Sequence, residues 1–153
     1  MIKIPARVLI VDDEKDFVEM FSLRLEAQGE KVSTAHSGKE ALTLLAQTII
    51  DVVILDIRMP KIGGMELLPR LVSLSHQPAV IMLTGHGTIQ LATRAMKLGA
   101  YDFLTKPIDF DLLNQTVREA LQDQGNGMPS SAVSQIEPAQ IVGSNPALLQ
   151  SLA

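Results

Sequence analysis

The apolar run of residues 52–55, which ends at Asp56, restricts the possible folds more than any other stretch of the sequence. Four consecutive apolar residues are typical of a parallel strand that helices cover on both faces. Open α/β sheets bind their ligands at the carboxyl ends of such strands. We therefore expect Asp56 to lie at a binding edge, although an isolated Asp after a strand more often forms a turn or caps a helix.

Strand and helix patterns alternate along most of the chain. Four further strands are predicted at residues 7–11, 31–35, 79–83 and 101–104, and an amphipathic helical pattern follows each of them. This alternation indicates a parallel sheet. The first, third and fourth strands are continuous apolar runs and should be central, whereas the second and fifth contain polar residues and should lie at the edges. We predict an α/β fold of the doubly wound, flavodoxin-like type, with five parallel strands in the order 2-1-3-4-5.

This strand order places Asp12, Asp13 and Asp56 in one crevice, at the switch point between the first and third strands. Two carboxylates about 4 Å apart repel by roughly 4 kcal/mol at an effective dielectric constant of 20, so we expect a cation among them. Oxygen ligands favour Mg²⁺ or Mn²⁺ over zinc, and the backbone carbonyl of Arg58 offers one more. The alternative is that the acidic run 12–14 only stabilises the amino end of the next helix.

Thr84 and Lys106 end the fourth and fifth predicted strands, at the same edge as the three carboxylates. A carboxylate that attacks phosphorus needs the charge on the phosphoryl oxygens neutralised. A metal ion, the ammonium of Lys106 and the hydroxyl of Thr84 could each hold one of these oxygens. Each residue is unremarkable alone, because a strand often ends in Thr and a Lys is usually solvated. Together they indicate that Asp56 is a nucleophile that accepts a phosphoryl group.

Four motifs resemble the receiver domain of bacterial two-component response regulators. They are Val11-Asp12-Asp13-Glu14, Leu55-Asp56-Ile57-Arg58-Met59-Pro60 with Gly64, Leu83-Thr84-Gly85-His86, and Phe103-Leu104-Thr105-Lys106-Pro107. The resemblance covers about residues 7–122. It implies that a sensor histidine kinase passes a phosphoryl group from its phosphohistidine to this domain. The domain would then be a phosphorylation switch that catalyses only its own phosphorylation and dephosphorylation, and not an enzyme with a separate substrate.

The resemblance also assigns a role to each residue at the predicted edge. Asp56 would be the phosphoacceptor, Thr84 the switch hydroxyl, Lys106 the phosphate-binding lysine and Phe103 the switch aromatic, while Asp12, Asp13, Asp56 and the carbonyl of Arg58 would hold Mg²⁺ or Mn²⁺. Two positions depart from the pattern of the family. Gly63 stands where many members have Asp, and Phe103 lacks the hydroxyl through which a tyrosine could act. Rotation of an apolar ring into and out of a pocket remains available to Phe103.

The turn 84–87 and the stretch 99–103 resemble the NtrC-type regulators, in which an AAA+ ATPase follows the receiver. We therefore expect a receiver domain at 1–123, a flexible linker rich in Gly, Pro and Ser at 124–140, and the start of a truncated AAA+ output domain at 141–153. The chain contains no G-x-x-x-x-G-K-[ST] motif, so these 153 residues should not hydrolyse ATP through a P-loop. The output is expected to be transcriptional.

The composition is that of an ordinary globular protein and excludes several partners. The formal net charge of −4 gives no basic stripe for nucleic acid, so we expect no direct nucleic-acid binding by this segment. The absence of cysteine excludes disulfides and thiolate metal sites. No stretch has the pattern of a signal peptide or a membrane span, and we expect a cytoplasmic protein. A sensor histidine kinase and a second copy of the chain are the expected partners.

Two other functions remain open at this level. A phosphohydrolase of the haloacid dehalogenase type also uses Asp, Thr or Ser, Lys and Mg²⁺ on a parallel sheet. Its first strand normally ends in Asp-x-Asp, whereas Asp12 and Asp13 are adjacent here, and no cap insertion is visible. An interaction module that is never phosphorylated is the second alternative, and the complete set of acid, threonine and lysine argues against it.

Overall fold

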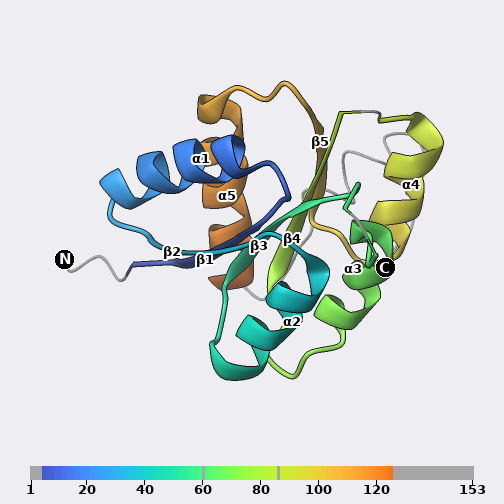
Figure 1. The fold of residues 1–153 in the computed structure, drawn as a ribbon, viewed down its shortest axis with the longest axis horizontal. Helices are drawn as coiled ribbons and strands as arrows, with labels where there is room; N and C mark the ends of the chain where they lie inside the picture. The colour runs from blue at the N-terminus through green and yellow to red at the C-terminus, as the bar shows by residue number, and fades with distance from the viewer. Residues whose placement is uncertain (1–4, 60, 86, 126–153) are drawn as a thin grey trace. The chain divides into compact units, whose positions relative to one another are not determined.

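The computed structural model describes residues 5–59, 61–85 and 87–125, in which five parallel strands alternate with five helices (Figure 1). The strand order is β2-β1-β3-β4-β5, which confirms the predicted topology. The strands are β1 (Arg7–Val11), β2 (Lys31–Ala35), β3 (Val52–Asp56), β4 (Ala79–Thr84) and β5 (Asp102–Thr105). The helices are α1 (Lys15–Ala27), α2 (Gly38–Gln47), α3 (Gly64–Val72), α4 (Ile89–Lys97) and α5 (Phe110–Gly125).

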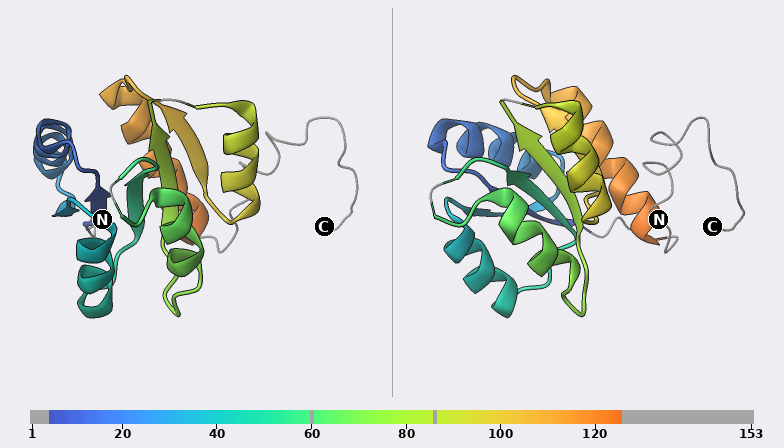
Figure 2. Two further views of the ribbon diagram at one scale, coloured as in Figure 1. Left: turned by 45° about the vertical axis from the view of Figure 1, so that its right-hand side comes forward. Right: turned by 90° about the vertical axis from the view of Figure 1, so that its right-hand side faces the viewer.

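Helices cover both faces of the sheet, which explains why the central strands are apolar without interruption. Val8 and Ile10 of β1 pack into the core under α1 and α5, whereas Leu9 and Val11 pack into the core under α2, α3 and α4. Figure 2 shows these two groups of helices on opposite sides of the strands. Burying a Val, Leu or Ile side chain contributes roughly 1.5–3 kcal/mol. Polar side chains are therefore confined to the ends of the central strands, and the carboxyl ends hold the site.

The buried face of α1 differs from the predicted one. Val18, Phe21 and Leu25 are buried at helical spacing, and Phe17 packs against the same core. The spacing of Phe17, Met20, Phe21 and Leu25 in the sequence predicts that all four share this face, but Met20 is 50% exposed, so the prediction was wrong for Met20. Successive helical residues are about 100° apart around the axis, and Met20 lies one residue before Phe21 at the border of the apolar stripe.

Several element ends also shift from their predicted places. The strand predicted at 79–83 extends to Thr84, and the one predicted at 101–104 is Asp102–Thr105. The sequence Ser37-Gly38-Lys39-Glu40 has the pattern of a capping box, and at the start of α2 the hydroxyl of Ser37 accepts the N–H of Glu40 as this pattern predicts. The Glu40 carboxylate, however, accepts the N–H of His36 and not that of Ser37. These shifts of one residue leave the topology unchanged.

The carboxyl-terminal helix extends slightly beyond the predicted domain boundary. The predicted receiver ends at 123, and α5 continues to Gly125. The rest of the predicted linker, and the output segment predicted at 141–153, lie outside the described residues. Within 5–59, 61–85 and 87–125, no helix combines the length and the hydropathy needed to cross a bilayer.

The loop between β3 and α3 approaches the site so closely that only glycine fits at residue 64. The N–H of Gly64 donates a hydrogen bond of 2.9 Å to the carbonyl of Ile57. A Cβ at this position would lie 2.8 Å from the Cα of Ile57 and would collide with the backbone carbonyl oxygen of Asp56. Because both obstacles are backbone atoms, a side-chain rotation cannot relieve the clash. Gly64 thus brings the start of α3 against the strand end that carries Asp56.

We predict that Gly64→Ala lowers the free energy of unfolding by about 1–3 kcal/mol, the usual cost of overpacking. Urea denaturation followed by circular dichroism measures this difference. Gly85→Ala is the matched control, because nothing lies within 4 Å of a Cβ at Gly85. It should change the stability by less than about 0.5 kcal/mol. Equal stability of Gly64→Ala and the wild type would contradict the backbone clash.

Candidate functional site

The register of the sheet brings the acidic residues together. Val11 of β1 pairs with Leu55 of β3, so the next residues along the two strands, Asp12 and Asp56, lie beside each other. Carboxylate oxygens of Asp12, Asp13 and Asp56 all lie within 4.8 Å of one another. Asp12 is 0% exposed and Asp56 is 5% exposed, whereas Asp13 is open to solvent. The structure therefore gathers the three carboxylates that the sequence placed in one crevice.

Lys106 enters this group of acids from the end of β5. Its backbone N–H donates a 2.7 Å hydrogen bond to the carbonyl of Thr84, which fixes the start of the loop after β5 against the end of β4. Its ammonium lies 2.7 Å from Oδ2 of Asp12, 2.6 Å from Oε1 of Glu14 and 4.0 Å from Oδ2 of Asp56. The Lys106–Pro107 peptide bond is cis. A positive charge thus sits among carboxylates that would otherwise repel one another.

The surroundings of Asp56 make its carboxylate difficult to ionise. Burial, followed by the negative charges of Asp12 and Asp13, raises its pKa from 3.8 to a net value of about 6. The ammonium of Lys106 and the backbone N–H of Arg58 lower this pKa in part. The N–H of Arg58 donates to Oδ1 of Asp56 at 3.3 Å. Asp56 is therefore mainly ionised at neutral pH but poorly solvated, which suits a nucleophile.

Lys106 keeps its proton in this environment. Burial alone would lower its pKa, but the hydrogen bonds to Asp12 and Glu14, together with the charges of Asp12 and Asp56, raise the pKa above its ordinary 10.5. The net direction agrees with the geometry, because a lysine in contact with two carboxylates favours the charged form. The ammonium is consequently a permanent cation at the carboxyl edge of the sheet.

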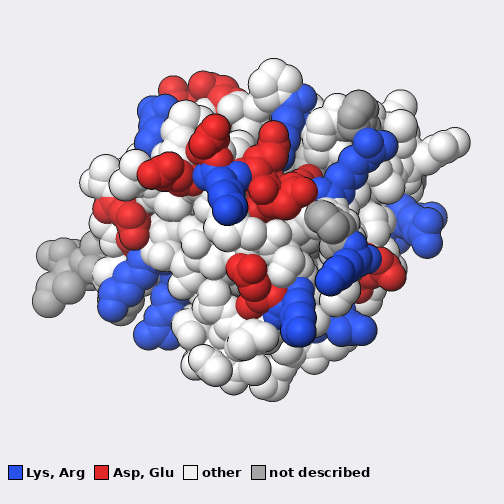
Figure 3. All heavy atoms as spheres, in the orientation of Figure 1, with Lys and Arg blue, Asp and Glu red and all other residues white. Residues whose placement is uncertain are grey.

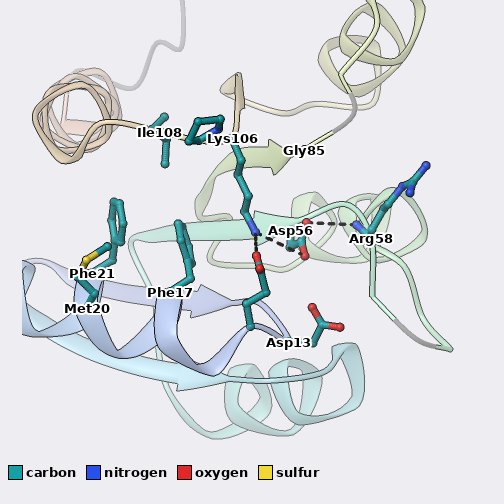
Figure 4. A pocket seen from close by; sticks show the side chains of 11 residues that line it. Asp13, Phe17, Met20, Phe21, Asp56, Arg58, Gly85, Lys106 and Ile108 are labelled. Carbon is teal, nitrogen blue, oxygen red and sulfur yellow. Dashed lines mark hydrogen bonds and ion pairs between the residues drawn. The ribbon is translucent and has the colours of Figure 1, made fainter.

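An open pocket of about 590 Å³ lies at the site, with the acidic residues on one side and apolar residues on the other (Figure 4). It is lined by Asp13, Glu14, Phe17, Met20, Phe21, Asp56, Arg58, Gly85, Lys106, Pro107 and Ile108. In Figure 4 the side chain of Lys106 passes between Phe17 and Asp56. Acidic side chains also gather near the middle of the face in Figure 3, and basic side chains border them. Asp56 is thus reachable from solvent through a passage with one polar and one apolar wall.

Thr84 and Phe103 lie near this site without lining the pocket. Thr84 is 1% exposed at the end of β4. Phe103 is half-buried on β5 and packs against the core under α2, α3 and α4. A Cβ added at Gly87 would lie 2.7 Å from the methyl group of Thr105, 3.1 Å from a ring carbon of Phe103 and 3.3 Å from the methyl group of Thr84. The two residues expected to act as a switch therefore border the same small space beside Gly87.

Sequence reasoning missed three contributors to the site. Glu14 was named in the acidic run 12–14 and in a receiver motif without a role at the site, yet it binds Lys106. The ring of Phe17 lies under the same ammonium, 4.6 Å from Nζ to the ring centroid. From its place after the second predicted strand, His36 would be expected to be an ordinary surface histidine, but it is half-buried and hydrogen-bonded through Nδ1 to the backbone carbonyl of Asp12 at 3.2 Å. Their positions in the sequence could have indicated these three residues, because each closely follows the carboxyl end of β1 or β2.

A five-stranded doubly wound domain with three carboxylates, a threonine and a lysine at its carboxyl edge has the architecture of a response regulator receiver domain. The model of the response regulator receiver domain family matches residues 8–118. The chain therefore belongs to this family, which confirms the resemblance seen in the sequence. The family match gives no support to a haloacid dehalogenase-like phosphohydrolase.

Curated relatives of the chain are transcriptional regulators of the NtrC type, the subgroup that the sequence indicated. The transcriptional regulatory protein GlrR of Escherichia coli is 41% identical over 118 residues, which cover 77% of this chain and 27% of that protein. The transcriptional regulatory protein ZraR of Salmonella typhimurium is 31% identical over 151 residues, or 97% of this chain and 34% of that protein. The chain thus spans about a quarter to a third of the length of these relatives.

Solved structures agree with the fold. A response regulator receiver domain protein from Clostridium thermocellum superposes with a TM-score of 0.75 at 37% identity, over 80% of this chain and 99% of that one. A CheY-like receiver domain protein from Methanospirillum hungatei gives a TM-score of 0.77 at 27% identity, over 81% of this chain and 99% of that one. The receiver fold therefore accounts for the described part of the chain.

The raised pKa of Asp56 predicts that Asp56→Asn stabilises the metal-free protein. Above pH 6 the folded state carries the full cost of the poorly solvated charge, and most of this cost is lost as the pH falls from 6 to about 4, toward the unfolded pKa of 3.8. Asparagine avoids the cost. Urea denaturation in EDTA should show the variant about 1–3 kcal/mol more stable at pH 8, with little difference at pH 4. A difference that does not depend on pH would contradict this origin.

Proposed function

We propose that the domain accepts a phosphoryl group on Asp56 from the phosphohistidine of a sensor histidine kinase and thereby switches an output domain. An oxygen of Asp56 forms a bond to phosphorus as the P–N bond breaks, and the imidazole nitrogen keeps the electron pair of that bond. The observation that carries the proposal is the convergence of Asp56 with Asp12, Asp13 and Lys106 at one sheet edge, in a chain of the receiver family.

The residues around Asp56 have complementary roles in this step. The N–H of Arg58 orients the carboxylate through its bond to Oδ1. Lys106, whose ammonium is 4.0 Å from Oδ2, binds a phosphoryl oxygen as a point charge. The hydroxyl of Thr84 and the backbone amide of Gly85 serve another oxygen. Charge stabilisation and positioning of this kind account for most of the catalysis in phosphoryl transfer.

The three carboxylates also fit a divalent cation. Asp12, Asp13 and Asp56 offer oxygens within 4.8 Å of one another, and we propose the carbonyl of Arg58 as a further ligand. This donor set contains only oxygen, which suits Mg²⁺ or Mn²⁺. Bound there, the cation would neutralise negative charge on the carboxylates and on the phosphoryl group.

We further propose how phosphorylation reaches the output. Thr84 moves toward the phosphoryl group, and because the side chains of Thr84 and Phe103 border the same space beside Gly87, the ring of Phe103 changes its position on β5. The surface formed by α4 and β5 then differs between the two states and controls a homodimer or an output domain. Relatives named as transcriptional regulators support a transcriptional output, reached without nucleic-acid contact by this domain.

Incubation with acetyl phosphate and Mg²⁺ tests the proposed acceptor. Intact-mass spectrometry should find one phosphoryl group on the wild type, and Asp56→Asn or the addition of EDTA should abolish the labelling. Asp111→Asn, which removes an exposed carboxylate from the first turn of α5, should label like the wild type. Unchanged labelling of Asp56→Asn would refute the assignment of the acceptor. Sustained turnover of a phosphomonoester that Asp12→Asn abolishes would favour the phosphohydrolase instead.

A further inference from the structure

Glu14 is the N-cap residue of α1, but its side chain does not cap the helix. Ser, Thr, Asp and Asn are the residues that usually cap a helix from this position, and the longer Glu is not one of them. Here Oε1 of Glu14 instead accepts a 2.6 Å hydrogen bond from the ammonium of Lys106, which lies 92 residues later in the chain. The carboxylate of Glu14 is therefore directed toward the reactive edge and away from its own helix.

The ammonium of Lys106 is enclosed by groups other than the proposed acceptor. Oδ2 of Asp12 at 2.7 Å and Oε1 of Glu14 at 2.6 Å accept hydrogen bonds from it, and the ring of Phe17 lies 4.6 Å away. Phe17 is itself held by stacking on Phe21, with ring centroids 4.4 Å apart. The carboxylate of Asp56, at 4.0 Å, is the most distant of the three acids around Lys106. The ammonium of Lys106 is therefore held by residues at the start of α1 and just before it, and not by Asp56.

We propose that Glu14 is a positioning residue that holds Lys106 in the unphosphorylated state and competes with the phosphoryl group on Asp56 for its ammonium. This inference rests on the proposed function of Asp56 as the acceptor. Asp12 also binds Lys106, but it belongs to the proposed Mg²⁺ ligands. Glu14 lies outside that ligand set, so its ion pair with Lys106 is the contact that can persist when the cation is bound.

The expected effect is modest, because the side chain of Glu14 is 62% exposed while that of Lys106 is 16% exposed. Solvent weakens an ion pair of this kind, and its loss changes an equilibrium by roughly two- to five-fold. The competition therefore adjusts the balance between the two states without locking either one.

The test compares Glu14→Gln with the wild type in binding beryllofluoride, a phosphoryl mimic, at saturating Mg²⁺. The variant should bind about two- to five-fold more tightly. Asp16→Asn is the matched control, since it removes the same formal charge from the first turn of α1. It should bind like the wild type. Equal affinities of Glu14→Gln and the wild type, or an equal gain in Asp16→Asn, would overturn the proposal.

A second measurement uses the metal-free protein. The side-chain ammonium of Lys106 should give a slowly exchanging NMR signal in the wild type and in Asp16→Asn, and a faster-exchanging one in Glu14→Gln.

The salt dependence of beryllofluoride binding, again at saturating Mg²⁺, tests the electrostatic origin of the effect. Salt near 1 M, where the Debye length is about 3 Å, should bring the affinities of Glu14→Gln and the wild type together. If the wild type binds no beryllofluoride, the proposed function itself fails, whereas binding that Glu14→Gln leaves unchanged refutes only the competition.

Discussion

The ion pair between Lys106 and Asp12 is the interaction on which the rest of the site depends. Asp12 is 0% exposed, and a buried ionised carboxylate is costly unless a partner neutralises it. Lys106 supplies that charge across 94 residues, which ties the end of β5 to the end of β1. The bond from its backbone N–H to Thr84 joins β4 to the same point. One residue therefore links the strand ends from which the site is built.

This electrostatic centre is placed accurately because it rests on rigid elements. The parallel register aligns Val11 with Leu55, and so fixes the separation of the acids beyond them. Both faces of the sheet are buried, so polar groups can gather only at the strand ends. Gly64 adds a further restraint by bringing the start of α3 against the carbonyl of Asp56. A site supported by strands holds its geometry better than one built on loops alone.

The same concentration of charged groups makes the site sensitive to a change of charge at Asp56. Burial and the neighbouring acids leave Asp56 ionised but poorly stabilised, with a pKa of about 6. Lys106 is shared among three carboxylates, so under the proposed function a change in charge at Asp56 would alter which partner it prefers. A phosphoryl group that adds negative charge at Asp56 would therefore shift a balance that already exists in the unmodified protein. Such a balance is what a two-state signalling domain requires.

The sequence by itself determined the fold class and the strand order. It also identified five residues of the candidate site, Asp12, Asp13, Asp56, Thr84 and Lys106, because the ends of parallel strands meet at one edge of the sheet and local motifs mark those ends. Only the tertiary structure decided which carboxylates and which aromatic ring contact the ammonium of Lys106. The contacts of Lys106 with Glu14 and Phe17 join residues about 90 positions apart, and no local pattern reports the direction of a long, flexible side chain. The exposure of Met20 had a similar origin, since a residue at the border of a helical stripe is buried or exposed according to what packs beside it.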